Sequence, residues 1–183
     1  SPVVELAAGL ERTCARLQGG DVWCWGANPN GEGVGPSTST AAALPTPTKV
    51  GGLPPASKLT YAGSHGCILS TAKEPWCWGS NYGGELGAVG APSVSDPVKV
   101  DAIATADDIA SSAYASCALL AGSISCWGTN GGGALGTGGP DTDVALTPGP
   151  IAGGLDDFVE LVGGASTIMC ARRTGGEIRC WGF

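Results

Sequence analysis

The triplet Cys-Trp-Gly occurs four times in this chain, and another cysteine precedes each copy by nine or ten positions. All eight cysteines fall into such pairs: Cys14 with Cys24, Cys67 with Cys77, Cys117 with Cys126, and Cys170 with Cys180. One local pattern that recurs about every 50 residues indicates a repeat protein. We therefore predict one repeat domain of four units, at residues 1–54, 55–105, 106–154 and 155–183, the last of them truncated.

The composition favours strands and turns, because 32 glycines and 13 prolines are spread over 183 residues. A net charge of −7 argues against nucleic acids and anionic membrane surfaces as partners. No apolar stretch is long enough for a spanning helix, so we expect no membrane insertion. The chain starts at Ser1 without a signal peptide, which suggests a processed product.

Each cysteine pair brackets a hairpin pattern, in which two short strands flank a glycine-containing turn. A three-residue turn at 18–20 places Cys14 opposite Cys24, and a two-residue turn at 121–122 places Cys117 opposite Cys126. The spacing therefore predicts one disulfide within each unit. Zinc is the alternative, but the C-x₂₋₄-C spacing is absent and His65 is the only histidine. Disulfides imply an oxidising compartment, so we expect a secreted protein, extracellular or on the cell surface.

Each unit reads as three strands and then a turn-rich segment that leads to a fourth, proline-led strand. We expect first strands at 3–8, 58–62, 108–111 and 158–162, and fourth strands at 47–50, 97–100 and 148–151. Proline in the fourth strand suits a sheet edge. Four short strands per unit predict an all-β fold of propeller-type blades with antiparallel strands.

After the second cysteine, residues 78–87 and 127–136 share the pattern Trp-Gly-x-Asn-x-x-Gly-x-Leu-Gly, and residues 25–35 carry one extra residue. Here the chain resembles the regulator of chromosome condensation repeat family, in a secreted, disulfide-containing, bacterial-type version. A histidine typical of that family is present only as His65. Members are usually seven-bladed propellers and include a nuclear nucleotide-exchange factor, plant photoreceptors and a secreted β-lactamase inhibitor. The resemblance therefore implies a fold and a binding surface, but no particular activity.

The sequence offers no nucleophile paired with a base, so we predict no enzyme, no catalytic residue and no cofactor. We expect His65 to pack within a blade or cap its edge. Acidic pairs at 107–108 and 156–157, and the cluster at 141–143, lack a complete calcium-loop spacing. We interpret them as turn formers and predict no metal site.

A segment rich in hydroxyl groups and proline lies in the first unit and suggests O-linked glycan, with a flexible connection between blades as the alternative. The candidate acceptors are Ser37, Thr38, Ser39, Thr40, Thr46 and Thr48. Aromatic residues outside the repeated motif are too scattered along the sequence to mark a binding hot spot: Tyr61, Tyr82, Tyr114, Trp76, Phe158 and Phe183.

Two functions fit these observations. The first is a structural extracellular protein that self-associates, either head to tail into a fibre or as paired arcs that close a ring. The second is a secreted protein-binding or inhibitory module that uses loops at one rim of the propeller. The first explains the disulfide in every unit and the unpaired strand edges of an incomplete ring. The expected partners are therefore copies of the chain itself or another protein.

Overall fold

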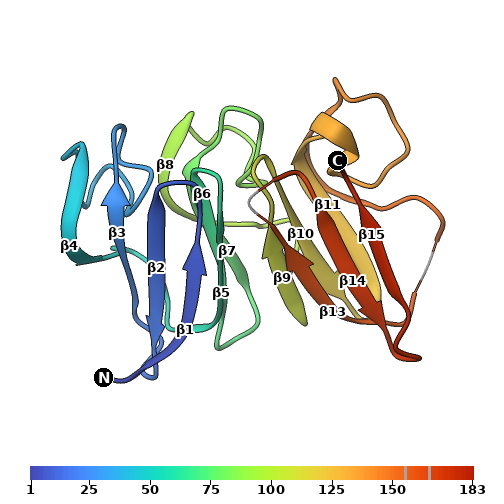
Figure 1. Cartoon of the computed structure of the whole chain (residues 1–183), viewed down its shortest axis with the longest axis horizontal. Helices are drawn as coiled ribbons and strands as arrows, with labels where there is room; N and C mark the ends of the chain where they lie inside the picture. The colour runs from blue at the N-terminus through green and yellow to red at the C-terminus, as the bar shows by residue number, and fades with distance from the viewer. Residues whose placement is uncertain (155, 165) are drawn as a thin grey trace.

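The computed structural model describes residues 1–154, 156–164 and 166–183, and it is all-β, as predicted. The strands form four antiparallel sheets, which we call blades one to four (Figure 1). Blade one contains β1 (Val3–Ala8), β2 (Arg12–Leu17), β3 (Val22–Ala27) and β4 (Ala43–Lys49). Blade two contains β5 (Ala56–Ala62), β6 (His65–Ser70), β7 (Pro75–Ser80) and β8 (Val94–Lys99).

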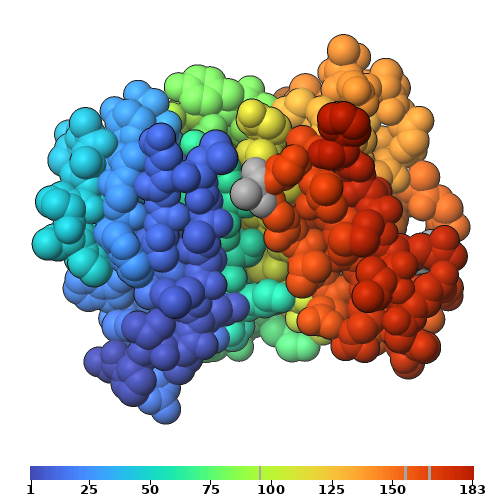
Figure 2. Space-filling model, in the orientation of Figure 1, coloured from blue at the N-terminus to red at the C-terminus, as the bar shows by residue number. Residues whose placement is uncertain are grey.

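Blade three contains β9 (Asp108–Ser111), β10 (Ala115–Leu120), β11 (Ser123–Thr129) and β12 (Val144–Pro150). Blade four contains β13 (Phe158–Gly163), β14 (Met169–Arg173) and β15 (Ile178–Trp181). The first strands of successive blades adjoin one another, so β1, β5, β9 and β13 form the inner side of an arc. Figure 2 shows blade one and blade four at opposite ends of the molecule.

The central hairpin of each blade has the register that the cysteine spacing predicts. Cys14 lies opposite Cys24 in blade one, and Cys117 lies opposite Cys126 in blade three. The shorter hairpin of blade three turns through Ala121 and Gly122, whose φ angles are 47° and 90°. Positive φ at both central residues suits a two-residue hairpin turn. The turn therefore absorbs the one-residue difference between the units.

The fourth strands begin earlier than the sequence suggests. β4 starts at Ala43, β8 at Val94 and β12 at Val144, so the prolines lie inside these strands and do not lead them. Each fourth strand is the outer edge of its sheet and lacks a neighbour on one side. A proline without an N–H is tolerated there.

The apolar core lies between the blades, in three clusters that each join neighbouring sheets. Blade two covers Val22 of blade one with Leu59 and Ile68. The cluster between blades three and four includes Leu119 and Leu161. Each blade is thus stabilised by its neighbours, as in other repeat proteins.

Candidate functional site

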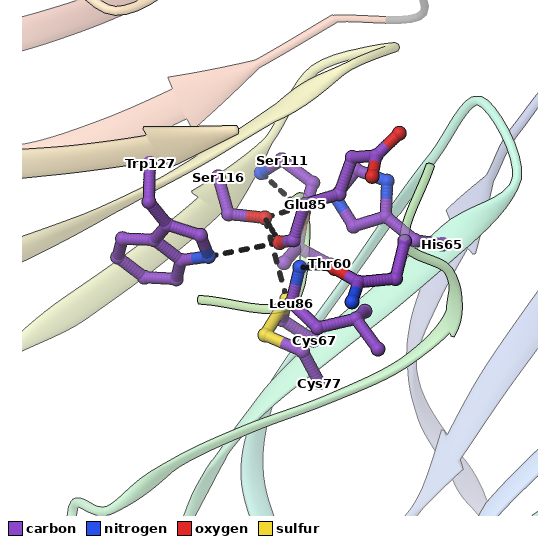
Figure 3. The surroundings of a disulfide bond; sticks show 10 residues. Thr60, His65, Cys67, Cys77, Glu85, Leu86, Ser111, Ser116 and Trp127 are labelled. Carbon is purple, nitrogen blue, oxygen red and sulfur yellow. Dashed lines mark hydrogen bonds between the residues drawn. A yellow bond between two sulfur atoms is a disulfide. The ribbon is translucent and has the colours of Figure 1, made fainter. Parts of the chain in front are cut away.

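Each part of the Cys-Trp-Gly motif has a separate role in the joint between two blades. The cysteines form one disulfide in each blade, with paired Cα atoms 4.0–4.1 Å apart. In blades one to three the disulfide lies in the apolar cluster shared with the next blade along the chain. Figure 3 shows the Cys67–Cys77 disulfide beside residues of blade three. The sulfur atoms therefore form part of the joint as well as closing the hairpin.

The tryptophan of the motif points the opposite way, toward the preceding blade. The Trp78 indole donates to the Gly33 carbonyl over 3.1 Å, and that of Trp127 donates to the Glu85 carbonyl over 2.8 Å. Trp181 donates likewise to Ala134 over 3.0 Å. A buried indole N–H needs an acceptor, so each bond fixes the turn segment of one blade against the next.

The glycine of the motif is required by the backbone. Gly79 has a φ of 98°, and a Cβ there would lie 2.6 Å from the Ser64 carbonyl oxygen. Gly26 and Gly128 also have positive φ and would meet a carbonyl oxygen at equivalent positions. Only glycine combines this conformation with so close an approach. In blades one to three this glycine lies at the register shift between the third strand and its edge strand.

The turns between the first and second strands lie along one edge of the blades, and we call this edge the rim. A pocket of about 360 Å³ opens there, lined by residues of blades one, two and three. Three large exposed side chains line it: Leu10 (71% exposed), Tyr82 (71%) and Tyr114 (54%). Glu85 also lines the pocket but is only 4% exposed. The pocket therefore combines an apolar and aromatic edge with a buried carboxyl group.

The Glu85 side chain is held by the turn segment that precedes Leu86. Its Oε2 accepts a hydrogen bond from the Gly83 N–H over 2.8 Å. Burial raises the pKa of the Glu85 carboxyl, against the lowering effect of backbone N–H donors. In Figure 3 the carboxylate extends away from Trp127 and Ser116, which both donate to the Glu85 backbone carbonyl. The backbone of Glu85 therefore belongs to the joint, while its side chain belongs to the pocket.

Blade one carries the equivalent carboxylate, Glu32, in an ion pair. Arg12 Nη2 lies 2.9 Å from Glu32 Oε2, and both side chains are buried. The guanidinium also donates to the Tyr61 hydroxyl over 3.4 Å and to the Ala27 carbonyl. Burial raises the pKa of Tyr61 to about 12, despite the lowering effect of Arg12, so the phenol stays protonated. A second pocket of about 340 Å³ has Arg12 and Glu32 among its lining residues.

His65 holds the Arg12 position in blade two and does not provide a cation. Its ring is fully buried, and Nε2 lies 2.8 Å from Ser116 Oγ of blade three. Burial lowers the pKa of His65 to about 4, so the ring is neutral at pH 7. The packing role expected from the sequence agrees with this position.

The candidate glycan acceptors lie together on the outside of blade one, apart from the rim pocket. Ser37 bonds to Asp96 of blade two, and Thr38 Oγ1 accepts from the Gly51 N–H over 3.2 Å. These contacts tie the segment to its surroundings, so it is not a free linker. O-glycosylation at Ser37, Thr38, Ser39, Thr40, Thr46 and Thr48 stays a prediction.

The acidic pairs are held by protein groups. Asp107 accepts from Lys73 over 2.8 Å, and Asp108 accepts from Lys58 and from the Leu161 N–H. Asp157 contacts Arg173. Among the described residues, no cluster of three or more His, Cys, Asp or Glu side chains could hold a metal ion. Within the same residues, no helix is long and apolar enough to cross a membrane.

Two aromatic residues that are far apart in sequence, Tyr82 and Tyr114, line the same pocket. Neither this proximity nor a role for Glu85 was predicted from the sequence. A signal was present, because Glu32 and Glu85 each directly follow a glycine and lie four residues after the asparagine of the turn segment. The residues two positions before Cys14 and Cys67 are Arg12 and His65. This difference would have distinguished the glutamate that is paired with a cation from the one that is not.

The fold and its joints define a class: an arc of propeller blades in which every blade carries its own disulfide. Residues 3–32, in blade one, match the family model of the regulator of chromosome condensation (RCC1) repeat. The described part of the chain has the same RCC1-type propeller fold. No curated protein matches the chain by sequence.

Solved structures of propeller proteins are similar to nearly the whole chain. Human WBSCR16 has a TM-score of 0.83 and 21% identity, covering 98% of this chain and 47% of its own. Prp20p from Saccharomyces cerevisiae has a TM-score of 0.73 and 19% identity, covering 98% and 43%. The ectodomain of the Physcomitrella patens receptor kinase CR4 has a TM-score of 0.58 and 24% identity, covering 99% and 41%. The chain thus spans less than half the length of each.

Proposed function

We propose that this chain is a non-enzymatic protein-binding module of propeller type that works in an oxidising compartment. The observation that carries the proposal is the rim pocket, where Leu10, Tyr82 and Tyr114 surround the buried Glu85. Exposed tyrosines around a buried polar group resemble the anchor pockets of protein interfaces. The four disulfides support the choice of compartment.

The similar structures support the same proposal. Prp20p has binding properties toward Gsp1p and histones, and Kap60 has been crystallised bound to yeast RCC1. These partners belong to those proteins. What carries over to this chain is that a propeller of this type presents surfaces for other proteins.

A peptide library displayed on phage and selected against the whole chain tests the proposal. We expect selected peptides to lose at least tenfold in affinity when Tyr82 and Tyr114 are replaced by serine, because the aromatic anchors are removed. The matched control replaces Val3 and Val4, which are also exposed but lie at the opposite end of β1 from Leu10. Peptides that bind both variants equally, or a selection that yields no binders, would contradict a binding role for the rim.

Self-association is the second candidate, and the outer face of blade four favours it. In blades one to three the disulfide-bearing face is covered by the next blade. In blade four this face exposes Val162 and Ile178, which line a shallow pocket with Cys170. At the other end of the arc, Trp25 of blade one is half-buried, whereas Trp78 and Trp127 are fully buried.

We therefore propose that the exposed disulfide face of blade four binds the Trp25 face of blade one in a second copy. Within the chain, each joint brings together the disulfide face of one blade and the tryptophan face of the next. Such a head-to-tail contact can extend into a fibre or close a ring. Sedimentation velocity at rising concentration should show species larger than the 18.0 kDa monomer. Replacing Val162 and Ile178 by serine should restore the monomer. A monomer at all concentrations in the unmodified chain would rule self-association out.

A further inference from the structure

Blades one and two carry the same turn at the rim, and among the described residues only the turn of blade one has a cation beside its glutamate. In blade one the Asn30 N–H donates to Glu32 Oε2 over 3.2 Å, and in blade two the Gly83 N–H donates to Glu85 Oε2 over 2.8 Å. Both turns are also fixed by an asparagine whose Oδ1 accepts from a backbone N–H five residues later. The two carboxylates are therefore presented by equivalent backbone.

The difference lies in what faces each carboxylate. Glu32 receives Arg12 Nη2 at 2.9 Å. The side chains that line the Glu85 pocket, all among the described residues, include no lysine or arginine: Leu10, Ser64, Ser80, Tyr82, Ala113, Tyr114 and Thr129. His65 stands where Arg12 stands in blade one, but it is neutral and turned toward Ser116. Blade two thus has the acceptor of an ion pair without its donor.

A carboxylate that is 4% exposed and lacks a cation is held at a cost in free energy. An external cation that reached the pocket would restore the interaction that Arg12 provides in blade one. The overall charge of −7 would also attract a basic partner.

The pocket suits a guanidinium better than an ammonium group. In blade one Arg12 contacts a carboxylate, a tyrosine hydroxyl and a backbone carbonyl at once, through a planar group with several donors. The Glu85 pocket offers two exposed tyrosine rings, against which a guanidinium can stack. A lysine ammonium lacks both the plane and the fork of donors.

We propose that the pocket over Glu85 binds the side chain of an arginine presented by a partner protein, in the manner of the internal Arg12–Glu32 pair. The inference rests on the proposed protein-binding function and names the chemistry of the partner. It requires an arginine that projects from a loop or chain end, because the pocket opens between exposed turns. Neither the disulfides nor the outer blade faces take part.

The test is a titration of the whole, ¹⁵N-labelled chain with the peptide acetyl-Gly-Arg-Gly-amide at pH 7, followed by NMR. We expect saturable shifts at the backbone amides of Gly83 and Leu86. The matched peptide with citrulline, which keeps the shape and loses the charge, should bind about tenfold or more weakly. The lysine peptide should bind between these two.

Two variants locate the binding. Glu85→Gln keeps the size of the side chain and should weaken the arginine peptide by about tenfold or more. Asp101→Asn removes one exposed acid in a turn elsewhere and should change the affinity less than about twofold. Equal shifts with arginine and citrulline, an unchanged affinity in Glu85→Gln, or no shift at all would overturn the inference. Library peptides that need Tyr82 and Tyr114 but contain no arginine would overturn it too, while leaving the binding function intact.

Discussion

Blade one and blade two each place a glutamate at the same position of the same turn, but the two glutamates have different neighbours. In blade one, Glu32 is paired with Arg12 and the pair is buried. In blade two, Glu85 has a backbone donor, and the neutral ring of His65 hydrogen-bonds to Ser116 of blade three through Nε2. One position, two residues before the first cysteine of each blade, accounts for the difference.

The comparison shows how a repeat can keep its joint and still vary its surface. Both blades have the disulfide and the positive-φ glycine, and the turn segment of each accepts an indole hydrogen bond from the next blade, because the backbone of the joint depends on these features. The residue at the Arg12 position lies beside the joint and can change without disturbing it. Functional differences between blades are therefore expected at such positions.

The largest effect should follow from removing the cation of blade one. We expect Arg12→Met to lower the free energy of unfolding by about 3 kcal/mol, because Glu32 is left as a buried charge without a cationic partner. Urea denaturation followed by tryptophan fluorescence would measure the change.

The control is the double variant Arg12→Met with Glu32→Gln. Removing both charges should recover most of the lost stability, since the glutamine can still accept from Asn30. A cost below about 1 kcal/mol for Arg12→Met alone would show that the pair contributes as little as an exposed one.

Much of the fold can be predicted from the sequence. Cysteine spacing predicts the hairpin register and one disulfide per blade, because the strand partner of each residue depends only on the length of the turn between. The starts of the fourth strands were not predictable by the same reasoning. Proline suggested a strand start, whereas edge strands with one free side accept proline in their interior.

The candidate site was less predictable, because it forms between blades. Tyr82 follows the third strand of blade two, and Tyr114 precedes the second strand of blade three. Their proximity depends on how the two blades pack, which no local pattern encodes. The unpaired state of Glu85 also depends on where the His65 ring points.

The second effect should appear as a dependence of stability on pH. Burial lowers the pKa of His65 from 6.5 to about 4 in the folded chain. The unfolded chain therefore binds a proton more readily, and stability that is present above pH 6.5 is lost as the pH falls toward 4. We expect a loss of about 2 kcal/mol from this residue between pH 7.5 and pH 5.

Urea denaturation at both pH values, in the unmodified chain and in His65→Gln, isolates this contribution. Carboxylates titrate in both proteins, so the difference in their pH dependence reports the histidine. If the two proteins lose the same stability over this range, then the pKa of His65 is the same in the folded and unfolded chain, and blade two gains a cation below about pH 6.5.

The smallest effect should come from Glu85→Gln, and its comparison with Glu32→Gln separates the two glutamates. Glu32→Gln removes one half of a buried ion pair and should destabilise the fold, whereas Glu85→Gln should change the free energy of unfolding at pH 7 by less than about 1 kcal/mol. Because burial raises the pKa of Glu85, its ionised form is disfavoured in the fold, and the unmodified chain should gain stability relative to Glu85→Gln as the pH falls. Denaturation of both variants at pH 7 and pH 5 measures these differences. A strongly destabilised Glu85→Gln at pH 7 would mean that Glu85 already has a cationic partner within the chain, and the contrast between the two blades would disappear.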